Sequence, residues 1–192
     1  VYASKILTPN HSYLSGSNLS PNVDDFIIGV GTYFYDGMFG DNALRKVYEN
    51  LETVLKDNPV YGHWAFVVHK NGKTYVFSDM TGSLRLYVWY DGDTITVTTS
   101  LTASYSSITN PTIDKTRLSA FLAGNMGCDG PFVEGIENFN SLKYVEITPN
   151  EGFKLIDREI PKVKRIETME EAIPYVRELF ACQIAQLRAI GE

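Results

Sequence analysis

The chain has 192 residues, of which 44% are hydrophobic and twelve are tyrosine, so it can bury the core of one large domain, with or without a tail. Its formal net charge of −6 argues against nucleic acid as a partner, and the sequence contains no run of 18 apolar residues that would predict a membrane span. The first residues lack the charged and apolar regions of a signal peptide and the two cysteines are far apart, so we expect a cytoplasmic protein with reduced thiols.

The first third of the chain predicts a loop, a strand and a helix, in that order. Residues 8–24 are rich in Ser, Asn and Pro, which is typical of a loop. The apolar run from Asp25 to Tyr35 predicts a buried strand. Asp41 is expected to cap a single helix, whose apolar side chains recur at helical spacing until Asp57-Asn58-Pro59 ends it.

Four alternating apolar runs follow, and they predict a four-stranded antiparallel meander. Asn71-Gly72 and Asp91-Gly92-Asp93 are strong hairpin signals, because type I′ turns need positive φ angles that Asn, Asp and Gly tolerate. Thr81-Gly82 marks a looser turn. The four runs are Trp64 to Val68, Thr74 to Phe77, Leu84 to Tyr90 and Thr94 to Thr99.

Beyond the meander the pattern predicts a short helix and a hairpin. Asp114 is expected to cap a helix that Gly124 closes. Residues 142–148 and 152–157 are expected to pair across a Pro-Asn-Glu-Gly turn.

The C-terminal segment predicts a linker and one more helix. Residues 158–166 form a basic, extended stretch. A helix then begins at the capping pair Thr168 and Glu171 and carries an apolar stripe as far as Ile190, with Pro174 either near its start or at a kink. The sequence therefore divides into a domain over residues 1–157 and a linker with a helix over residues 158–192.

Few side chains in the sequence are candidates for chemistry. No Cys/His group has metal-site spacing, so we expect no metal site. The Gly-Cys step at Cys128 could in principle self-cleave, although a plain free thiol is the expected state. His63 is expected to face away from its neighbour Trp64 on one strand.

Short motifs follow one another in a characteristic order between Tyr33 and Ile156. Gly62-His63-Trp64-Ala65-Phe66 resembles the Gly-x-Phe-Ala-Phe strand of the glutaminase domain of asparagine synthetases, which are class II glutamine amidotransferases. Ser78-Asp79-Met80-Thr81-Gly82 resembles the Arg-Asp-x-x-Gly turn of that family. The other matching segments are Asp36 to Asp41 with Ala43-Leu44-Arg45, Arg85 to Val88, Ser100 to Ser104, Leu118 to Gly124, Phe132 to Ile136 and residues 142–156.

The resemblance implies an α+β fold, the four-layer αββα Ntn-hydrolase-like sandwich of two antiparallel sheets flanked by helices. It also implies where a vestigial substrate pocket would lie. Asp36 and Gly37 match the family's Asn and Gly, and Asp79 and Gly82 belong to the matching turn. Considered without the resemblance, Asp36-Gly37 is expected to form a hairpin turn, and Asp79 to cap a turn by hydrogen bonding to its own backbone.

Several positions depart from what glutaminase chemistry requires. The family's nucleophile is an N-terminal cysteine, with the free α-amine as base, whereas residue 1 here is Val1. Asp36 accepts hydrogen bonds where the family's Asn donates one, and its charge would repel an oxyanion. Met38 stands in place of Glu and Ser78 in place of Arg, and the segment that clamps the substrate's α-amino group has no counterpart. We therefore expect no catalytic residue in this chain.

The resemblance and its departures together suggest a non-catalytic, pseudo-glutaminase domain of an asparagine-synthetase-type ATP-dependent amide ligase. Some ligases of this superfamily, such as β-lactam synthetase, carry such a domain without the cysteine. The family's Ser-Gly-Gly-x-Asp-Ser loop does not occur here, so ATP and Mg²⁺ are implied only for a synthetase domain in cis, which this domain would support structurally. Two alternatives stay open: an active glutaminase whose cysteine precedes Val1, and a stand-alone protein-binding module. A homo-oligomer also stays open.

Overall fold

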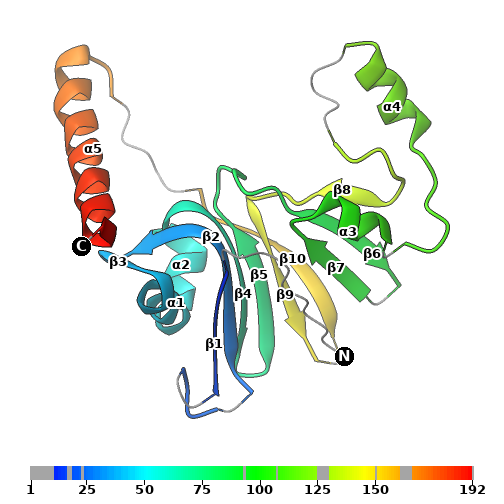
Figure 1. The fold of residues 1–192 in the computed structure, drawn as a ribbon, viewed down its shortest axis with the longest axis horizontal. Coiled ribbons are helices and arrows are strands. Elements are labelled where there is room, and N and C mark those ends of the chain that lie inside the picture. Colours follow the sequence, from blue (N-terminus) through cyan, green and yellow to red (C-terminus); the bar gives the residue numbers. More distant parts are fainter. Residues whose placement is uncertain are drawn as a thin grey trace.

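The computed structural model describes residues 11–16, 19–22, 24–92, 94–106, 108–124, 130–149, 151–160 and 166–191. Within these residues the protein is an α+β protein with a seven-stranded antiparallel sheet, a three-stranded antiparallel sheet and five helices. Figure 1 shows the larger sheet at the centre, the smaller sheet to one side and helix α5 on the other side.

The larger sheet has the strand order β1-β2-β4-β5-β9-β10, and β3 pairs with β2. The predicted strand after Asp25 and the predicted C-terminal hairpin are both confirmed, as β2 and as β9 with β10. The strands are β1 (His11–Ser15), β2 (Phe26–Tyr35), β3 (Met38–Phe39), β4 (Tyr61–Lys70), β5 (Lys73–Ser78), β9 (Lys143–Thr148) and β10 (Gly152–Asp157).

Strand β1 corrects the expectation that residues 8–24 form a loop. Residues His11–Ser15 pair antiparallel with β2 over their whole length, and Leu14 packs against the hydrophobic core. The local sequence has little strand character, but the backbone groups along the edge of β2 supply the pairing. Tertiary context therefore overrides local propensity here.

The predicted meander is wrong as a single sheet, although its hairpins are present. Asn71 and Gly72 both have positive φ angles, +53° and +77°, as the type I′ turn between β4 and β5 requires. The next hairpin, β6 (Tyr87–Asp91) and β7 (Thr94–Thr98), lies instead in the smaller sheet, whose order is β7-β6-β8 with β8 at Ile136–Asn138. Strand β5 pairs on its other side with β9, with Val76 opposite Val145.

The predicted helix after Asp41 is two helices, α1 (Gly40–Glu49) and α2 (Leu51–Asp57). The N-cap residue is Phe39, and no side chain caps the helix there, so the expected Asp41 cap is wrong. The predicted apolar face is confirmed, because Leu44, Val47 and Val54 are fully buried. Asn58, in the left-handed region, ends α2.

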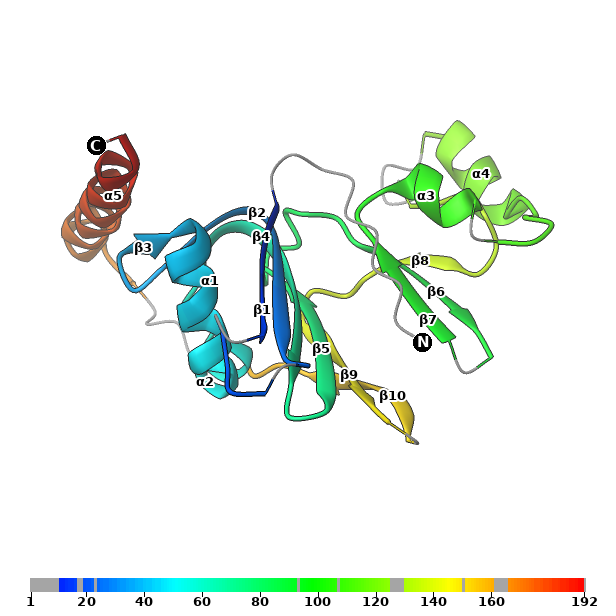
Figure 2. The same cartoon turned by 60° about the horizontal axis from the view of Figure 1, so that its bottom comes forward.

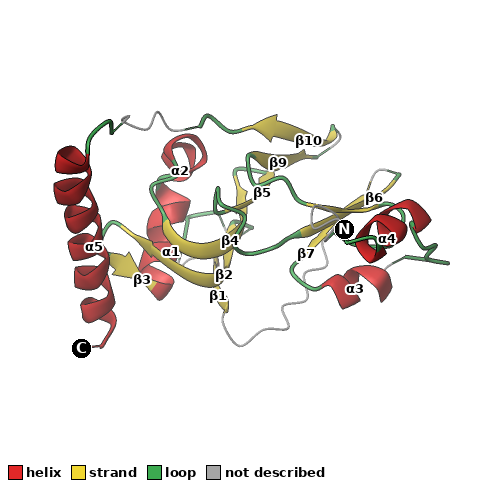
Figure 3. Cartoon of the chain, turned by 90° about the horizontal axis from the view of Figure 1, so that it is seen from above, coloured by secondary structure: helices red, strands yellow, loops and turns green. Residues whose placement is uncertain are grey.

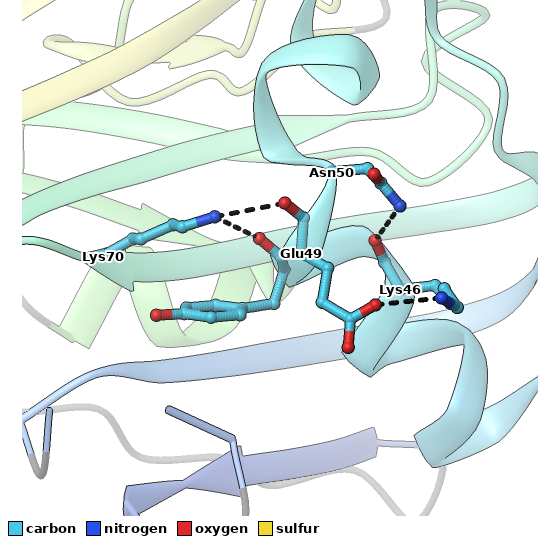
Figure 4. Close-up of polar contacts among 5 residues, drawn as sticks. Lys46, Glu49, Asn50 and Lys70 are labelled. Carbon is cyan, nitrogen blue, oxygen red and sulfur yellow. Dashed lines mark hydrogen bonds and ion pairs between the residues drawn. The ribbon is translucent and has the colours of Figure 1, made fainter. Parts of the chain in front are cut away.

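Side chains donate hydrogen bonds to the backbone carbonyl groups at the C-terminal end of α1 (Figure 4). The Lys70 Nζ donates to the carbonyl oxygens of Tyr48 and Glu49, at 2.7 and 3.3 Å, and lies 4.6 Å from the centre of the Tyr48 ring. The Asn50 side chain donates to the Lys46 carbonyl at 3.1 Å. A cation at the negative end of a helix is favourable, so Lys70 ties the end of β4 to the end of α1.

The core lies between these two helices and the larger sheet. Trp64 stacks on Phe66 with ring centroids 4.4 Å apart, and Phe77 meets both rings edge-on at 5.8 and 5.7 Å. The opposite face of the sheet is buried too, because Ile28, Ala65, Val76 and Val145 alternate with the core residues and are almost inaccessible. His63, as expected, points away from the side of Trp64 and is exposed.

The layers are easiest to see in Figure 2. Helices α1 and α2 lie on one side of the larger sheet, strands β6 to β8 lie toward the other side, and α3 and α4 lie beyond them. Helix α3 is Leu101–Ser106 and α4 is Lys115–Leu122. The predicted Asp114 cap of α4 is confirmed by a 2.9 Å hydrogen bond from the Arg117 N–H to the Asp114 carboxylate.

Helix α5 (Met169–Gly191) confirms the predicted C-terminal helix, and Pro174 lies within its first two turns. The Glu171 N–H donates to the Thr168 hydroxyl at 3.3 Å, as the capping pair predicts. The helix lies beside β3, on the side of the molecule away from the smaller sheet (Figures 1 and 3). Its large apolar side chains that the structure describes are 40–69% exposed, from Met169 to Ile184.

Strands β2 and β4 approach each other unusually closely at two glycines. Gly31 has a φ of +98°, and a Cβ atom there would lie 2.1 Å from the His63 carbonyl oxygen. Gly62 has a φ of +113°, and a Cβ atom there would lie 2.1 Å from the Thr32 carbonyl oxygen. Any other residue at either position would force the two central strands apart.

We predict that Gly31→Ala lowers the free energy of unfolding by about 3–5 kcal/mol, because it adds backbone strain to a steric clash. Gly72→Ala is the matched control: its φ is also positive, but nothing lies within 4 Å of the added Cβ. That variant should lose only about 1–2 kcal/mol. Urea unfolding measures both, and equal losses would mean that the close approach of β2 and β4 is unimportant.

Candidate functional site

The turn after β5 is built around the buried carboxylate of Asp79, which is 4% exposed. Its two oxygens accept hydrogen bonds from the Ser83 N–H at 3.1 Å, the Leu84 N–H at 3.3 Å and the Thr81 hydroxyl. The Asp79 carbonyl also accepts from the Gly82 N–H at 3.0 Å. Asp79 therefore holds the turn itself, as the Asx-type interpretation predicted.

These hydrogen bonds set the charge of the group. Burial alone would raise the pKa of Asp79, but the donors from Thr81, Ser83 and Leu84 outweigh burial and hold its pKa below the ordinary value. The carboxylate is thus ionised at neutral pH, and its acceptor positions are directed at its own turn.

Arg158 corrects the expectation that residues 158–166 are only a basic, extended linker. Its side chain is buried, with 5% of the residue exposed. The guanidinium donates to the Ser78 carbonyl at 2.6 Å, to the Ser141 carbonyl at 3.3 Å and to the Asn58 side-chain oxygen at 2.9 Å. One side chain therefore joins the end of β5, the turn before β9 and the end of α2.

The charge of Arg158 sits close to that of Asp79. Burial lowers the pKa of the Arg158 guanidinium to about 10, and the Asp79 carboxylate opposes that shift. Arg158 thus stays protonated at neutral pH. Its guanidinium binds the carbonyl of Ser78. Ser78 is the position where the glutaminase family that the sequence resembles has an Arg. Sequence reasoning missed Arg158, because its hydrogen-bond partners lie 80, 17 and 100 residues away along the chain and no local pattern marks them.

Asp36 and Gly37 form the two-residue turn between β2 and β3. Their φ angles are +53° and +71°, so the hairpin interpretation is confirmed. Asp36 is exposed, and its charge adds to burial in raising the pKa of Tyr35 above the ordinary value. A carboxylate in this place offers an acceptor and no donor.

The two turns that the sequence analysis singled out lie at the same end of the larger sheet. Strands β2 and β5 both end there, because each runs antiparallel to β4. Within the described residues, no hydrogen bond or ion pair joins Asp36 to Asp79. Gly82 packs near Ser141, whose hydroxyl donates to the Met80 carbonyl at 3.0 Å. The four residues therefore stabilise two separate turns.

A second buried carboxylate, Asp25, was not singled out from sequence. It is 1% exposed and accepts from the Tyr48 hydroxyl at 2.5 Å, the Asn22 amide at 3.0 Å and the Asn71 N–H at 3.1 Å. Ser20 donates to it as well, at 3.0 Å. Asp25 thus fixes the loop before β2 to helix α1 and to the β4–β5 turn, which is a structural role.

Other candidate groups give no site within the described residues. Val1 and Cys128 both lie outside those residues, so the expectations about them stay predictions. No group of three or more His, Cys, Asp or Glu side chains in the described part of the chain is arranged to hold a metal ion. None of the helices there combines the length and the apolar character needed to span a bilayer.

Comparison of the chain with models of known protein families gives no match, and comparison with curated protein sequences gives none either.

We predict that Arg158→Met lowers the free energy of unfolding by about 2–4 kcal/mol, because it leaves three oxygens without their donor. Arg158→Lys should recover only part of this, since an ammonium cannot reproduce the planar fork. Lys154→Met on the neighbouring strand is the control: its ion pair with Glu151 is exposed, so the loss should stay below about 0.5 kcal/mol. A similar loss in both Met variants, measured by urea unfolding, would contradict the role given to Arg158.

The depressed pKa of Asp79 should make the stability of the protein depend on pH. Because its folded-state pKa is depressed, the stabilisation is present above the unfolded pKa of about 4 and is lost as the pH falls through the folded value. The Asp79→Asn variant lacks the ionised carboxylate and its stabilisation, so its free energy of unfolding at pH 7 should be lower by about 1–3 kcal/mol. Its stability should also fall less steeply below pH 4 than that of the wild type. Thermal unfolding between pH 2.5 and 7 tests this, and parallel curves would refute it.

Proposed function

We propose that this chain is a non-catalytic, glutaminase-like domain of an asparagine-synthetase-type amide ligase, and that it supports the synthetase domain structurally. In this proposal the two sheets and their helices are the four-layer αββα sandwich of the Ntn hydrolases. The arrangement in Figure 2 supports this, since α1 and α2 lie on one side of the larger sheet and β6 to β8 toward the other. The burial of both faces of the larger sheet supports it too.

The non-catalytic part of the proposal rests on the side-chain hydrogen bonds of Asp79, which are made within its own turn. Its carboxylate takes hydrogen bonds from Thr81, Ser83 and Leu84 of its own turn. The matching positions Asp36 and Gly37 form a tight, solvent-exposed hairpin turn, with a carboxylate where oxyanion stabilisation needs a donor. The residues that carry the resemblance thus have complete structural roles without a substrate.

Helix α5 supports the proposed partner. Its apolar side chains include Phe180, Val176 and Ile173, which are 59%, 43% and 46% exposed. Large apolar side chains gathered on one element are typical of an interaction surface. A synthetase domain in cis, with ATP and Mg²⁺ bound there, would cover them and account for their exposure.

The protein expressed from its native gene should release no glutamate from glutamine above the rate of a buffer blank. A class II glutaminase with its N-terminal cysteine, run in parallel, serves as the positive control. Glutamate release that a thiol-alkylating reagent abolishes would contradict the proposal and establish the active-glutaminase alternative. With a carboxylic acid substrate present, the same preparation should convert ATP to AMP and pyrophosphate, because the acid is adenylated and ammonia then displaces AMP to form the amide. Glutamine should not replace ammonia in this reaction.

A further inference from the structure

Strand β7 is an outer strand of the three-stranded sheet. The sheet order is β7-β6-β8, and within the described residues nothing pairs with the outer side of β7. An outer strand presents a row of backbone N–H and C=O groups that can pair with another extended strand. The five residues Thr94–Thr98 offer such a row about 17 Å long.

This edge lacks the features that usually prevent pairing between molecules. From Thr94 to Thr98 there is no charged residue, no proline and no glycine, and every side chain is β-branched. The other outer strand of this sheet, β8, is three residues long and carries Glu137. The outer strand β10 carries Lys154 and Asp157. Of these three outer strands, β7 alone carries no charged side chain.

The sequence of β7 is complementary to itself. Reversed about Thr96, the run Thr-Ile-Thr-Val-Thr places Thr94 opposite Thr98 and Ile95 opposite Val97. Thr–Thr pairs and pairs of β-branched side chains are favourable across antiparallel strands. We propose that β7 pairs antiparallel with β7 of a second copy of this chain, around a two-fold axis at Thr96.

The register within the sheet agrees with this pairing. Val97 lies opposite Val88 of β6, so Ile95 and Val97 are on the same face as that buried side chain. Across the two-fold axis, the Ile95 and Val97 side chains of both copies would form one continuous apolar face. The two three-stranded sheets would join into one sheet of six strands.

The size of the contact sets the expected affinity. A stable dimer buries about 1,200–2,000 Å² in total, and two paired five-residue strands bury less. The dimer should therefore be weak and depend on concentration. Because the contact is isologous, it uses up both β7 edges and ends at two copies. This inference is independent of the proposed function.

Sedimentation analysis of the whole chain tests the proposal. Between about 10 µM and about 1 mM, the average mass should rise from the 21.5 kDa of one chain toward twice that value. Thr96→Lys and Thr96→Glu should each weaken association at least about ten-fold, because like charges then face each other across the axis. An equimolar mixture of the two variants should associate at least as strongly as the wild type. Thr102→Lys, at an exposed position on α3, is the control and should dimerise normally.

A monomeric wild type at all concentrations would overturn the proposal. So would a dimer that Thr96→Lys and Thr96→Glu leave unchanged, or growth into open aggregates in place of a dimer. Circular dichroism shows whether each variant is folded. If substitution at Thr96 prevents folding, Thr98→Lys mixed with Thr94→Glu tests the same register, because these two positions lie opposite each other.

Discussion

The fold depends on the polar junction where β5 ends. There the chain leaves the seven-stranded sheet and begins the path to the three-stranded one. The Asp79 carboxylate holds the turn, and the Arg158 guanidinium joins the Ser78 carbonyl to Asn58 and Ser141 from two other parts of the chain. Without Arg158, the carbonyls of Ser78 and Ser141 and the side-chain oxygen of Asn58 would each lose a hydrogen-bond donor. Loss of this one side chain would therefore affect α2, β5 and the β9–β10 hairpin together.

The same junction explains how a sequence can resemble glutaminases at positions that have structural roles of their own. Asp79 and Gly82 are needed to turn the chain between two sheets, and Asp36 and Gly37 are needed to close a type I′ hairpin. Such requirements persist in the absence of a substrate. The chemistry requires in addition a donor at position 36 and a nucleophile, and the exposed carboxylate of Asp36 cannot act as that donor.

Sequence reasoning succeeded where the cause of a structure is local. Asn71-Gly72, the Asp114 cap and the Thr168 cap depend on residues within a few positions of each other, and all three are present. It failed where the cause is distant in sequence. Strand β1 exists because β2 offers an edge, β5 pairs with β9 about 70 residues away and not with β6, and Arg158 reaches back to Ser78. Nothing within the local sequence of 158–166 distinguishes a buried Arg from a solvated one.

The most direct test of this account is a glutamine titration of the isotope-labelled protein, followed by NMR at the backbone amides of Ser83 and Leu84. These two N–H groups donate to Asp79, so they report any change in the turn. We predict no shift of either resonance up to about 10 mM glutamine, well above KM values usual for enzymes, about 1 µM–1 mM. A saturable shift of both resonances would show that the turn still forms a glutamine pocket and would contradict its purely structural role.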